Sequence, residues 1–245
     1  MSEPLIRCAG ATKTFVLGKQ EVRALRGVDL EVKAGEFIAL VGPSGSGKTT
    51  LLNLIGALDL PTGGEVEVLG QRLAGLSRGA RADLRLRRIG FVFQAYNLVP
   101  VLTARENVEF VLELQGEGRQ RRRRATEVLE QVGLTDLADR RPLEMSGGQQ
   151  QRVAVARAIA ARPPLVLADE PTANLDGENA EVLMHLMRDL RDKEGMTFIF
   201  STHDARVVEH AVRVVTLEDG KVASDQEKAG EAPHPIIKGI GKVRA

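Results

Sequence analysis

The chain has 245 residues, of which 43% are hydrophobic and 27% are charged, and its net charge is +1. This composition is ordinary for a globular protein and excludes disordered and collagen-like classes, while the length suits one large α/β domain with or without a smaller inserted subdomain. The nearly neutral charge gives no overall attraction to nucleic acid, so we expect no nucleic-acid partner.

The sequence predicts no membrane-spanning helix. The most apolar stretch, residues 153–168, is interrupted by two arginines and a pair of prolines, so nothing approaches the roughly 18 consecutive apolar residues of a spanning helix. The start of the chain includes Glu3 and Pro4 and has no sustained apolar run, so we expect no signal peptide. Cys8 is the only cysteine, which excludes an intramolecular disulfide and fits a reducing compartment.

Short strands separated by turns are predicted in the first part of the chain, at residues 5–8, 27–32, 36–41, 65–69 and 89–93. Residues 37–41 form a continuous apolar run, which is typical of a strand buried on both faces. A glycine-rich loop and a helix beginning near Lys48 follow that strand.

The pattern becomes helical from Thr103 onward. Thr103 and Glu106 match a capping box, and apolar residues then recur at helical spacing. A second helix is predicted to end at Gly133. We expect residues 94–144 to form a helical subdomain inserted into the sheet domain.

Strands return later in the chain, at residues 165–168, 197–201 and 212–217. An amphipathic helix between the first two is predicted to end at Gly195. The alternation of strands and helices predicts an α/β fold with a mostly parallel sheet. The ordered domain is predicted to span residues 1–225, and residues 226–245 to form a polar, loosely held tail.

The glycine-rich loop fits the phosphate-loop pattern G-x-x-x-x-G-K-[ST] between a predicted buried strand and a predicted helix. Glycines let backbone N–H groups converge on phosphate oxygens, and the helix N-terminus adds a favourable dipole. Lys48 is expected to reach the β- and γ-phosphates of a nucleotide, and Thr49 to offer its hydroxyl to Mg²⁺. The alternative is a glycine turn that merely precedes a helix. The residues assigned to nucleotide binding here are Gly42, Pro43, Ser44, Gly45, Ser46, Gly47, Lys48, Thr49 and Thr50.

Two acidic residues end the predicted strand at 165–168. In phosphate-loop enzymes an Asp at such a position holds Mg²⁺, a role that we assign to Asp169. The side chain of Glu170 points differently, so it can polarise a water molecule aimed at the γ-phosphate. The alternative, that both acids only solvate a strand end, is weakened by the phosphate loop in the same chain.

Residues 145–149 read Met-Ser-Gly-Gly-Gln. Ser146 and Gln149 match a capping box at the start of a helix, and this purely structural interpretation stays open. Two glycines in a first helical turn each cost up to about 1 kcal/mol relative to alanine. Gly147 and Gly148 therefore indicate that an anion approaches bare backbone at this helix end.

With this segment the chain resembles the nucleotide-binding subunits of ABC transporters, whose signature reads L-S-G-G-Q. Met145 replaces the leucine and keeps its volume and apolarity. The resemblance covers nearly the whole chain, with the motifs in family order. The Walker A loop, the signature and the Walker B strand are accompanied by the Q-loop residue Gln94, the D-loop residue Asp176 and the switch histidine His203.

The resemblance also implies roles for single residues. Gln94 would sense Mg²⁺ and the attacking water, Asp176 would communicate across a dimer, and His203 would contact the γ-phosphate and orient the water at Glu170. The alternatives are a polar strand end for Gln94, an N-cap for Asp176 and a surface position for His203. Phe15 would stack on adenine, with core packing as the alternative.

The resemblance implies an ATPase that uses ATP and Mg²⁺. It also implies a P-loop fold with a mostly parallel central sheet, an N-terminal antiparallel β part and an inserted α-helical subdomain. Two copies would close head to tail, so that Ser146, Gly147, Gly148 and Gln149 of one copy complete the ATP site of the other. A separate membrane-spanning permease would hold the chain in the cytoplasm, peripherally on the inner face of the membrane, and would select the substrate.

Residues 94–100 and 173–176 most resemble the subgroup that serves lipoprotein release and macrolide export. This implies export or release of a lipophilic or lipoprotein-type substrate. The alternative is an ATPase of a non-transport membrane complex, such as a cell-division system. A kinase or GTPase is disfavoured by the signature and by the lack of an N-K-x-D guanine motif.

Two further segments have open interpretations. Arg119 and residues 121–124 form a basic cluster at the start of the predicted second helix. This cluster is either a solvated helix face or a surface that contacts an acidic partner or lipid head groups. Since arginines at a helix start oppose its dipole, we expect a compensating group. Residues 98–103 are unusually apolar for a connection, and the resemblance implies that this region receives a coupling helix of the membrane subunit, with core packing as the alternative.

Overall fold

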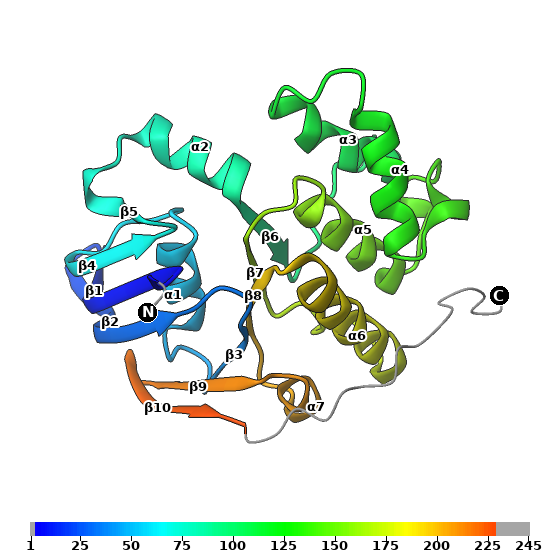
Figure 1. The fold of residues 1–245 in the computed structure, drawn as a ribbon. Coiled ribbons are helices and arrows are strands. Elements are labelled where there is room, and N and C mark those ends of the chain that lie inside the picture. Colours follow the sequence, from blue (N-terminus) through cyan, green and yellow to red (C-terminus); the bar gives the residue numbers. More distant parts are fainter. Residues whose placement is uncertain (1–2, 229–245) are drawn as a thin grey trace.

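The computed structural model describes residues 3–228 as two sheets with helices packed around them (Figure 1). Within this range the larger sheet has the strand order β10-β9-β3-β8-β7-β6. Its strands are β3 (Phe37–Val41), β6 (Ile89–Phe93), β7 (Leu165–Asp169), β8 (Thr197–Ser201), β9 (Arg213–Glu218) and β10 (Lys221–Glu227). All neighbours pair in parallel except β9 and β10, which confirms the prediction of a mostly parallel sheet.

The smaller sheet is antiparallel and contains the beginning of the described chain. Its strands are β1 (Ile6–Leu17), β2 (Gln20–Val32), β4 (Gly63–Val68) and β5 (Gln71–Arg72). β1 and β2 are far longer than the strands predicted at 5–8 and 27–32. The first four residues of β2 are all exposed, so they show no alternation of apolar and polar residues, and only the pairing with β1 defines them as strand.

The helices are α1 (Lys48–Ile55), α2 (Arg78–Arg88), α3 (Ala104–Leu114), α4 (Arg121–Gln131), α5 (Gly147–Ile159), α6 (Gly177–Glu194) and α7 (Ala205–Glu209). α3 begins at the predicted capping box, with both of its hydrogen bonds present. Gly133 and Gly195, which follow α4 and α6, have φ values of 69° and 68°, as expected for glycines that end helices. α2 was not predicted, because Leu84 is its only buried residue and gives no apolar stripe.

Two apolar cores cover the two faces of the larger sheet. One core lies between the sheet and α3–α6, and the other between the sheet, α1 and the antiparallel sheet (Figure 1). Phe37 and Ala39 of β3 belong to the first core, whereas Ile38 and Leu40 belong to the second. This division explains the continuous apolar run and confirms a strand buried on both faces.

The only cysteine, Cys8, lies in the core beneath the antiparallel sheet. Burial, helped by the negative charge of Asp29, raises the pKa of the Cys8 thiol to about 12. Because the thiolate is the reactive form, this cysteine is a packing residue and not a nucleophile.

The C-terminal edge of the sheet corrects the predicted domain boundary. β10 continues to Glu227 and pairs with β9, so the tail predicted from residue 226 starts at least two residues too early. Arg213 of β9 donates two hydrogen bonds to the carboxylate of Asp225, at 2.7 and 2.6 Å, and a third to Glu36 at 2.8 Å. The strand is mostly polar and gives no apolar pattern, so it was not predicted; its pairing with β9, these ion pairs and the packing of Val222 against the core hold it in place. The rest of the predicted tail, residues 229–245, lies outside the described residues.

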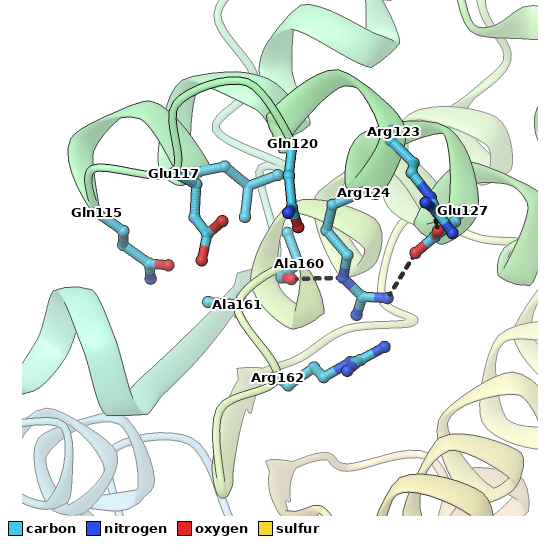
Figure 2. A pocket seen from close by; sticks show the side chains of 10 residues that line it. Gln115, Glu117, Gln120, Arg123, Arg124, Glu127, Ala160, Ala161 and Arg162 are labelled. Carbon is cyan, nitrogen blue, oxygen red and sulfur yellow. Dashed lines mark hydrogen bonds and ion pairs between the residues drawn. The ribbon is translucent and has the colours of Figure 1, made fainter.

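The arginine cluster at the start of α4 has compensating partners within the chain. Arg121 forms ion pairs with Glu109 and Glu113 of α3, at 3.8 and 3.5 Å. Arg124 donates to the carbonyl of Ala160 at the end of α5, where a cation is favoured by the helix dipole (Figure 2). Burial, with Arg162 nearby, lowers the pKa of Arg124. These contacts are the compensation expected for a basic helix start.

Candidate nucleotide site

Most of the predicted site residues meet at the edge of the larger sheet where β3, β6, β7 and β8 end. Parallel strands bring their carboxyl ends to one edge, and ligand sites of α/β sheets lie there. A cavity of about 740 Å³ opens at this edge. Its lining includes these predicted residues: Phe15, Gly42, Pro43, Ser44, Gly45, Gly47, Lys48, Thr49, Thr50, Gln94, Asp169, Glu170 and His203.

The glycines of the phosphate loop serve different structural needs. A Cβ on Gly42, whose φ is 143°, would lie 2.1 Å from the carbonyl oxygen of Leu217. A Cβ on Gly47, at φ 106°, would lie 2.7 Å from the carbonyl oxygen of Ala24. Gly45 has a φ of 79° but open space around it. The first and last glycines therefore allow the loop to pack against neighbouring strands, and Gly45 leaves backbone uncovered beside the cavity.

We expect Gly42→Ala to lower the free energy of unfolding by at least about 2 kcal/mol, since it adds a steric clash to an unfavourable φ. Gly45→Ala is the matched control, because it adds the unfavourable φ without the clash and should cost about 1 kcal/mol. Urea unfolding of both variants measures the difference. Equal losses would contradict the packing role of Gly42.

Ser46, assigned to nucleotide binding, is buried and does not line the cavity. Its backbone carbonyl accepts a hydrogen bond from Gly220 at 3.1 Å, and its backbone N–H donates to Pro43 at 3.2 Å. The backbone of Ser46 therefore holds the phosphate loop against the turn between β9 and β10.

Lys48 folds back over its own loop. Its Nζ donates to the carbonyl oxygens of Gly42 and Pro43, at 2.8 and 3.0 Å. No side chain caps the N-terminus of α1, where Gly47 is the N-cap residue. A lysine ammonium and uncapped helix N–H groups beside one cavity form an environment suited to phosphate oxygens.

The end of β7 places two carboxylates in the cavity with separate partners. Asp169 accepts hydrogen bonds from the hydroxyls of Thr49, at 3.2 Å, and Ser201, at 2.6 Å. Hydroxyl and carboxylate oxygens are the ligands that Mg²⁺ prefers, so Thr49 and Asp169 fit the predicted metal role. Glu170 instead lies 2.9 Å from Nδ1 of His203, which pairs the predicted base with the switch histidine.

The backbone at Glu170 is strained. This residue has a φ of 49°, a left-handed conformation that is uncommon for a residue other than glycine. Its N–H donates to the hydroxyl of Ser201 at 2.9 Å, and that hydroxyl also donates to Asp169. Ser201 thus fixes both acids relative to each other, a role that is not predicted from the sequence although Ser201 directly precedes the Thr202–His203 pair.

The Q-loop is held from two sides. The side chain of Asn174 donates to the carbonyl of Gln94 at 2.9 Å. Arg157 of α5 donates to the carbonyls of Asn97 and Tyr96, at 2.5 and 3.0 Å, and burial lowers its pKa. In the sequence, Arg157 is one of the two arginines that interrupt the apolar stretch at residues 153–168, and no role is predicted for it. A charged residue within a buried helix was the available signal that it has a specific partner.

The signature lies away from this cavity and starts α5. Ser146 and Gln149 form the capping box in full, so the structural interpretation is correct for these two residues. A Cβ on Gly148 would lie 2.6 Å from the side chain of Asn179, and a Cβ on Gly147 would lie 2.9 Å from the hydroxyl of Tyr96. Packing inside the chain thus gives Gly148 a structural reason to lack a side chain, whereas the contact at Gly147 is only with the far end of the Tyr96 side chain. The approach of an anion to this helix end stays a prediction.

Asp176 is the N-cap of α6 and also lies outside the cavity lining. Its carboxylate accepts from the backbone N–H of Asn179 at 2.8 Å and from the side-chain amide of the same residue. These hydrogen bonds hold the pKa of Asp176 below its usual value. Asn179 thus touches both the D-loop and the signature helix, which connects two motifs separated by about 30 positions in the chain.

Phe15 lies at the edge of the cavity and not in either core. It is 37% exposed, and the ammonium of Lys13 lies 5.1 Å from the centre of its ring. The core-packing alternative for Phe15 is therefore wrong, and an aromatic face is available at the cavity edge.

Comparison with known proteins agrees with this geometry. The family model described as "ABC transporter" matches residues 25–173, which is more than half of the chain. The chain belongs to the ABC transporter family. It is 48% identical to the lipoprotein-releasing system ATP-binding protein LolD of Anaeromyxobacter dehalogenans, over 92% of this chain and 95% of that protein. These findings confirm the resemblance to the nucleotide-binding subunits of ABC transporters.

Two other relatives of this ABC protein are informative. It is 42% identical to the macrolide export ATP-binding/permease protein MacB of Wolinella succinogenes, but it covers only 37% of that longer chain. It is 43% identical to the ABC transporter ATP-binding protein MJ0796 of Methanocaldococcus jannaschii, over 92% of this chain and 98% of that protein. The relatives thus include both export systems of the predicted subgroup.

A solved structure of MJ0796 matches the fold, with a TM-score of 0.85 at 42% identity and with 92% of this chain and all of that chain covered. It is described as a dimeric structure of a post-hydrolysis state bound to ADP and Pi. In the ABC protein described here, none of the helices within residues 3–228 has the length and apolarity to cross a membrane.

Proposed function

We propose that this ABC protein is the ATP-binding and ATP-hydrolysing subunit of a transporter, and that it drives a separate membrane-spanning permease. The observation that carries the proposal is the cavity in which the phosphate loop, Asp169, Glu170 and His203 meet. ATP would bind there with its phosphates on the loop and its adenine against Phe15. The names of the relatives support export or release of a lipophilic or lipoprotein-type substrate.

The positions of the polar groups assign the chemical steps. Lys48 would exchange its two loop carbonyls for oxygens of the β- and γ-phosphates. Mg²⁺, held by Thr49, Asp169 and Gln94, would neutralise charge on the phosphate oxygens. Glu170 would accept a proton from water while the water oxygen bonds to the γ-phosphorus and the bond to the β-γ bridging oxygen breaks. His203, 2.9 Å from Glu170, would orient that carboxylate and contact the γ-phosphate.

The signature residues and the D-loop residue Asp176 do not line the cavity of their own chain. This supports a second copy of the chain whose bound ATP they would contact. Ser146 is exposed and Gly147 half-buried at the start of α5, so the helix end is accessible to an anion from outside. A head-to-tail dimer would place Ser146, Gly147, Gly148 and Gln149 over the γ-phosphate held by the other copy, with Asp176 between the two sites. The dimeric structure of the relative MJ0796 supports this arrangement.

An apolar cleft supports docking of the permease. The cleft has a volume of about 490 Å³ and lies between α2, β6 and α3. Phe110 and Leu58 at this cleft are 45% and 44% exposed. Val99, from the apolar segment that follows the Q-loop, also lines the cleft. We propose that a coupling helix of the permease binds here, which places the chain peripherally on the cytoplasmic face of the membrane. The same cleft contains Arg157, so movement of the helix would reach the Q-loop.

Detergent co-purification of the native complex tests the proposed function. We expect Phe110→Ser to lose most of the permease from the purified complex, while the isolated subunit keeps its ATPase rate. Leu114→Ser is the matched control, because Leu114 is a 55% exposed leucine on the same helix as Phe110 but outside the lining of the cleft. Co-purification of a cell-division protein with the wild-type chain would contradict transport, and an undiminished permease yield with Phe110→Ser would contradict this docking site.

A further inference from the structure

Two histidines and one glutamate, none of which belongs to the nucleotide site, converge between α6 and the end of α7. Glu181 and His185 are four residues apart on α6, so they lie on one face of that helix. His210 is the C-cap residue of α7, 25 positions further along the chain. One ligand atom from each of the three residues lies within 4.8 Å of the other two. α6 and α7 pack against each other, at the lower right of the molecule in Figure 1.

The geometry points to a binding site for a divalent transition metal, Zn²⁺ first, held by Glu181, His185 and His210. The Nε2 of His210 lies 2.8 Å, and that of His185 3.9 Å, from the same Oε2 of Glu181. Ligand atoms around a tetrahedral zinc are about 3.4 Å apart, given zinc–ligand lengths of about 2.0–2.1 Å. Shifts of about 1 Å in side chains near the surface therefore bring the three atoms to coordination distance.

The donor set selects the metal. Imidazole nitrogen suits zinc, copper and nickel, whereas Mg²⁺ and Ca²⁺ prefer sites made of oxygen alone. The side chain of His210 is only 10% exposed and that of His185 is 33% exposed, so the two nitrogens are held on packed elements. Their rings are perpendicular, with centres 5.1 Å apart, and the Nε2 atom of each ring lies within 4 Å of the Glu181 carboxylate. The carboxylate, 48% exposed, leaves a fourth coordination position open to water.

The position of the site gives it a consequence for the ATPase cycle. α7 is capped by Asp204, the residue after His203, and α6 begins directly after Asp176. A metal bound by Glu181, His185 and His210 would link α6, which follows the D-loop, to α7, which follows the switch histidine. Zinc would thus stabilise the relative position of the two loops that face the ATP site and the second copy.

Zinc titration of the purified full-length protein, without nucleotide and with millimolar Mg²⁺ to occupy oxygen-only sites, tests the inference. We expect one Zn²⁺ per chain, a rise in melting temperature with zinc, and the absorption of tetrahedral Co²⁺ when cobalt replaces zinc. His210→Ala, His185→Gln and Glu181→Gln should each weaken zinc binding at least about tenfold, since even loss of a group that only supports a ligand costs about 10- to 100-fold. Circular dichroism of each variant checks its fold, and Glu181→Gln is the mildest change because Glu181 is exposed.

His203→Ala and His234→Ala are the matched controls, since they replace the two other histidines of the chain. Both should keep one Zn²⁺ per chain with unchanged affinity. Binding that is lost with His203→Ala and kept with His210→Ala would place the metal at the nucleotide site and overturn the inference. Less than one Zn²⁺ per wild-type chain, or equal affinity in wild type and all three ligand variants, would overturn it as well.

Discussion

Glu170→Gln should bind ATP with wild-type affinity and hydrolyse it about 10²- to 10⁴-fold more slowly, which is the usual contribution of a positioned proton acceptor. The amide keeps the shape of the carboxylate but cannot take the proton from water. Because ATP then persists, the two copies should stay closed around it. Size-exclusion chromatography with ATP and Mg²⁺ should show a dimer, and a phosphate-release assay should show the loss of turnover.

The signature provides the control for this dimer. Ser146→Asn keeps a residue that caps helices well, so α5 should remain folded, but it places a larger side chain over the bare helix end. We expect the double variant Glu170→Gln, Ser146→Asn to bind ATP as a monomer. Thr103→Asn, which makes the same kind of change at the capping box of α3, should leave the dimer intact. A Glu170→Gln protein that hydrolyses at the wild-type rate, or stays monomeric at high concentration, would refute the proposed mechanism.

Lys48→Ala should weaken nucleotide binding itself. A hydrogen bond to a charged group contributes about 1.5–3 kcal/mol, so losing the ammonium from the phosphates should reduce ATP affinity about 10- to 150-fold. Equilibrium titration with a fluorescent ATP analogue measures this loss. Hydrolysis should fall at least as far, since the same ammonium would neutralise charge that develops on the phosphate oxygens.

Two comparisons separate binding from folding in the Lys48 variant. Lys48 also bonds to Gly42 and Pro43, so urea unfolding of Lys48→Ala reports any loosening of the loop. Lys33→Ala removes the same charge from an exposed position outside the cavity and should keep full ATP affinity. Equal affinities in the Lys48→Ala and wild-type proteins would contradict the phosphate-binding role of the loop.

Local sequence patterns were sufficient for much of the fold. The apolar run of β3, the glycine-rich loop and the start of α1 lie next to one another in the chain, so their pattern could be recognised directly. The same holds for the capping boxes at Thr103 and Ser146, whose partners are three residues away. α2 and β10 were missed because neither has an apolar stripe. β10 is a strand because it pairs with β9, its neighbour in the chain, across the turn at Asp219–Gly220.

The sequence by itself determined the phosphate loop, the two acids after β7, and the signature, because each is a short contiguous pattern whose chemistry depends on its own spacing. Only the tertiary structure decided which of these residues share a cavity and why Gly148 has no side chain, since Asn179 packs against it from the next helix. It also brought His210 to Glu181 across 29 positions. The physical reason is that the packing of helices and strands sets these contacts. Packing brings together residues that are far apart in the chain and share no local sequence pattern.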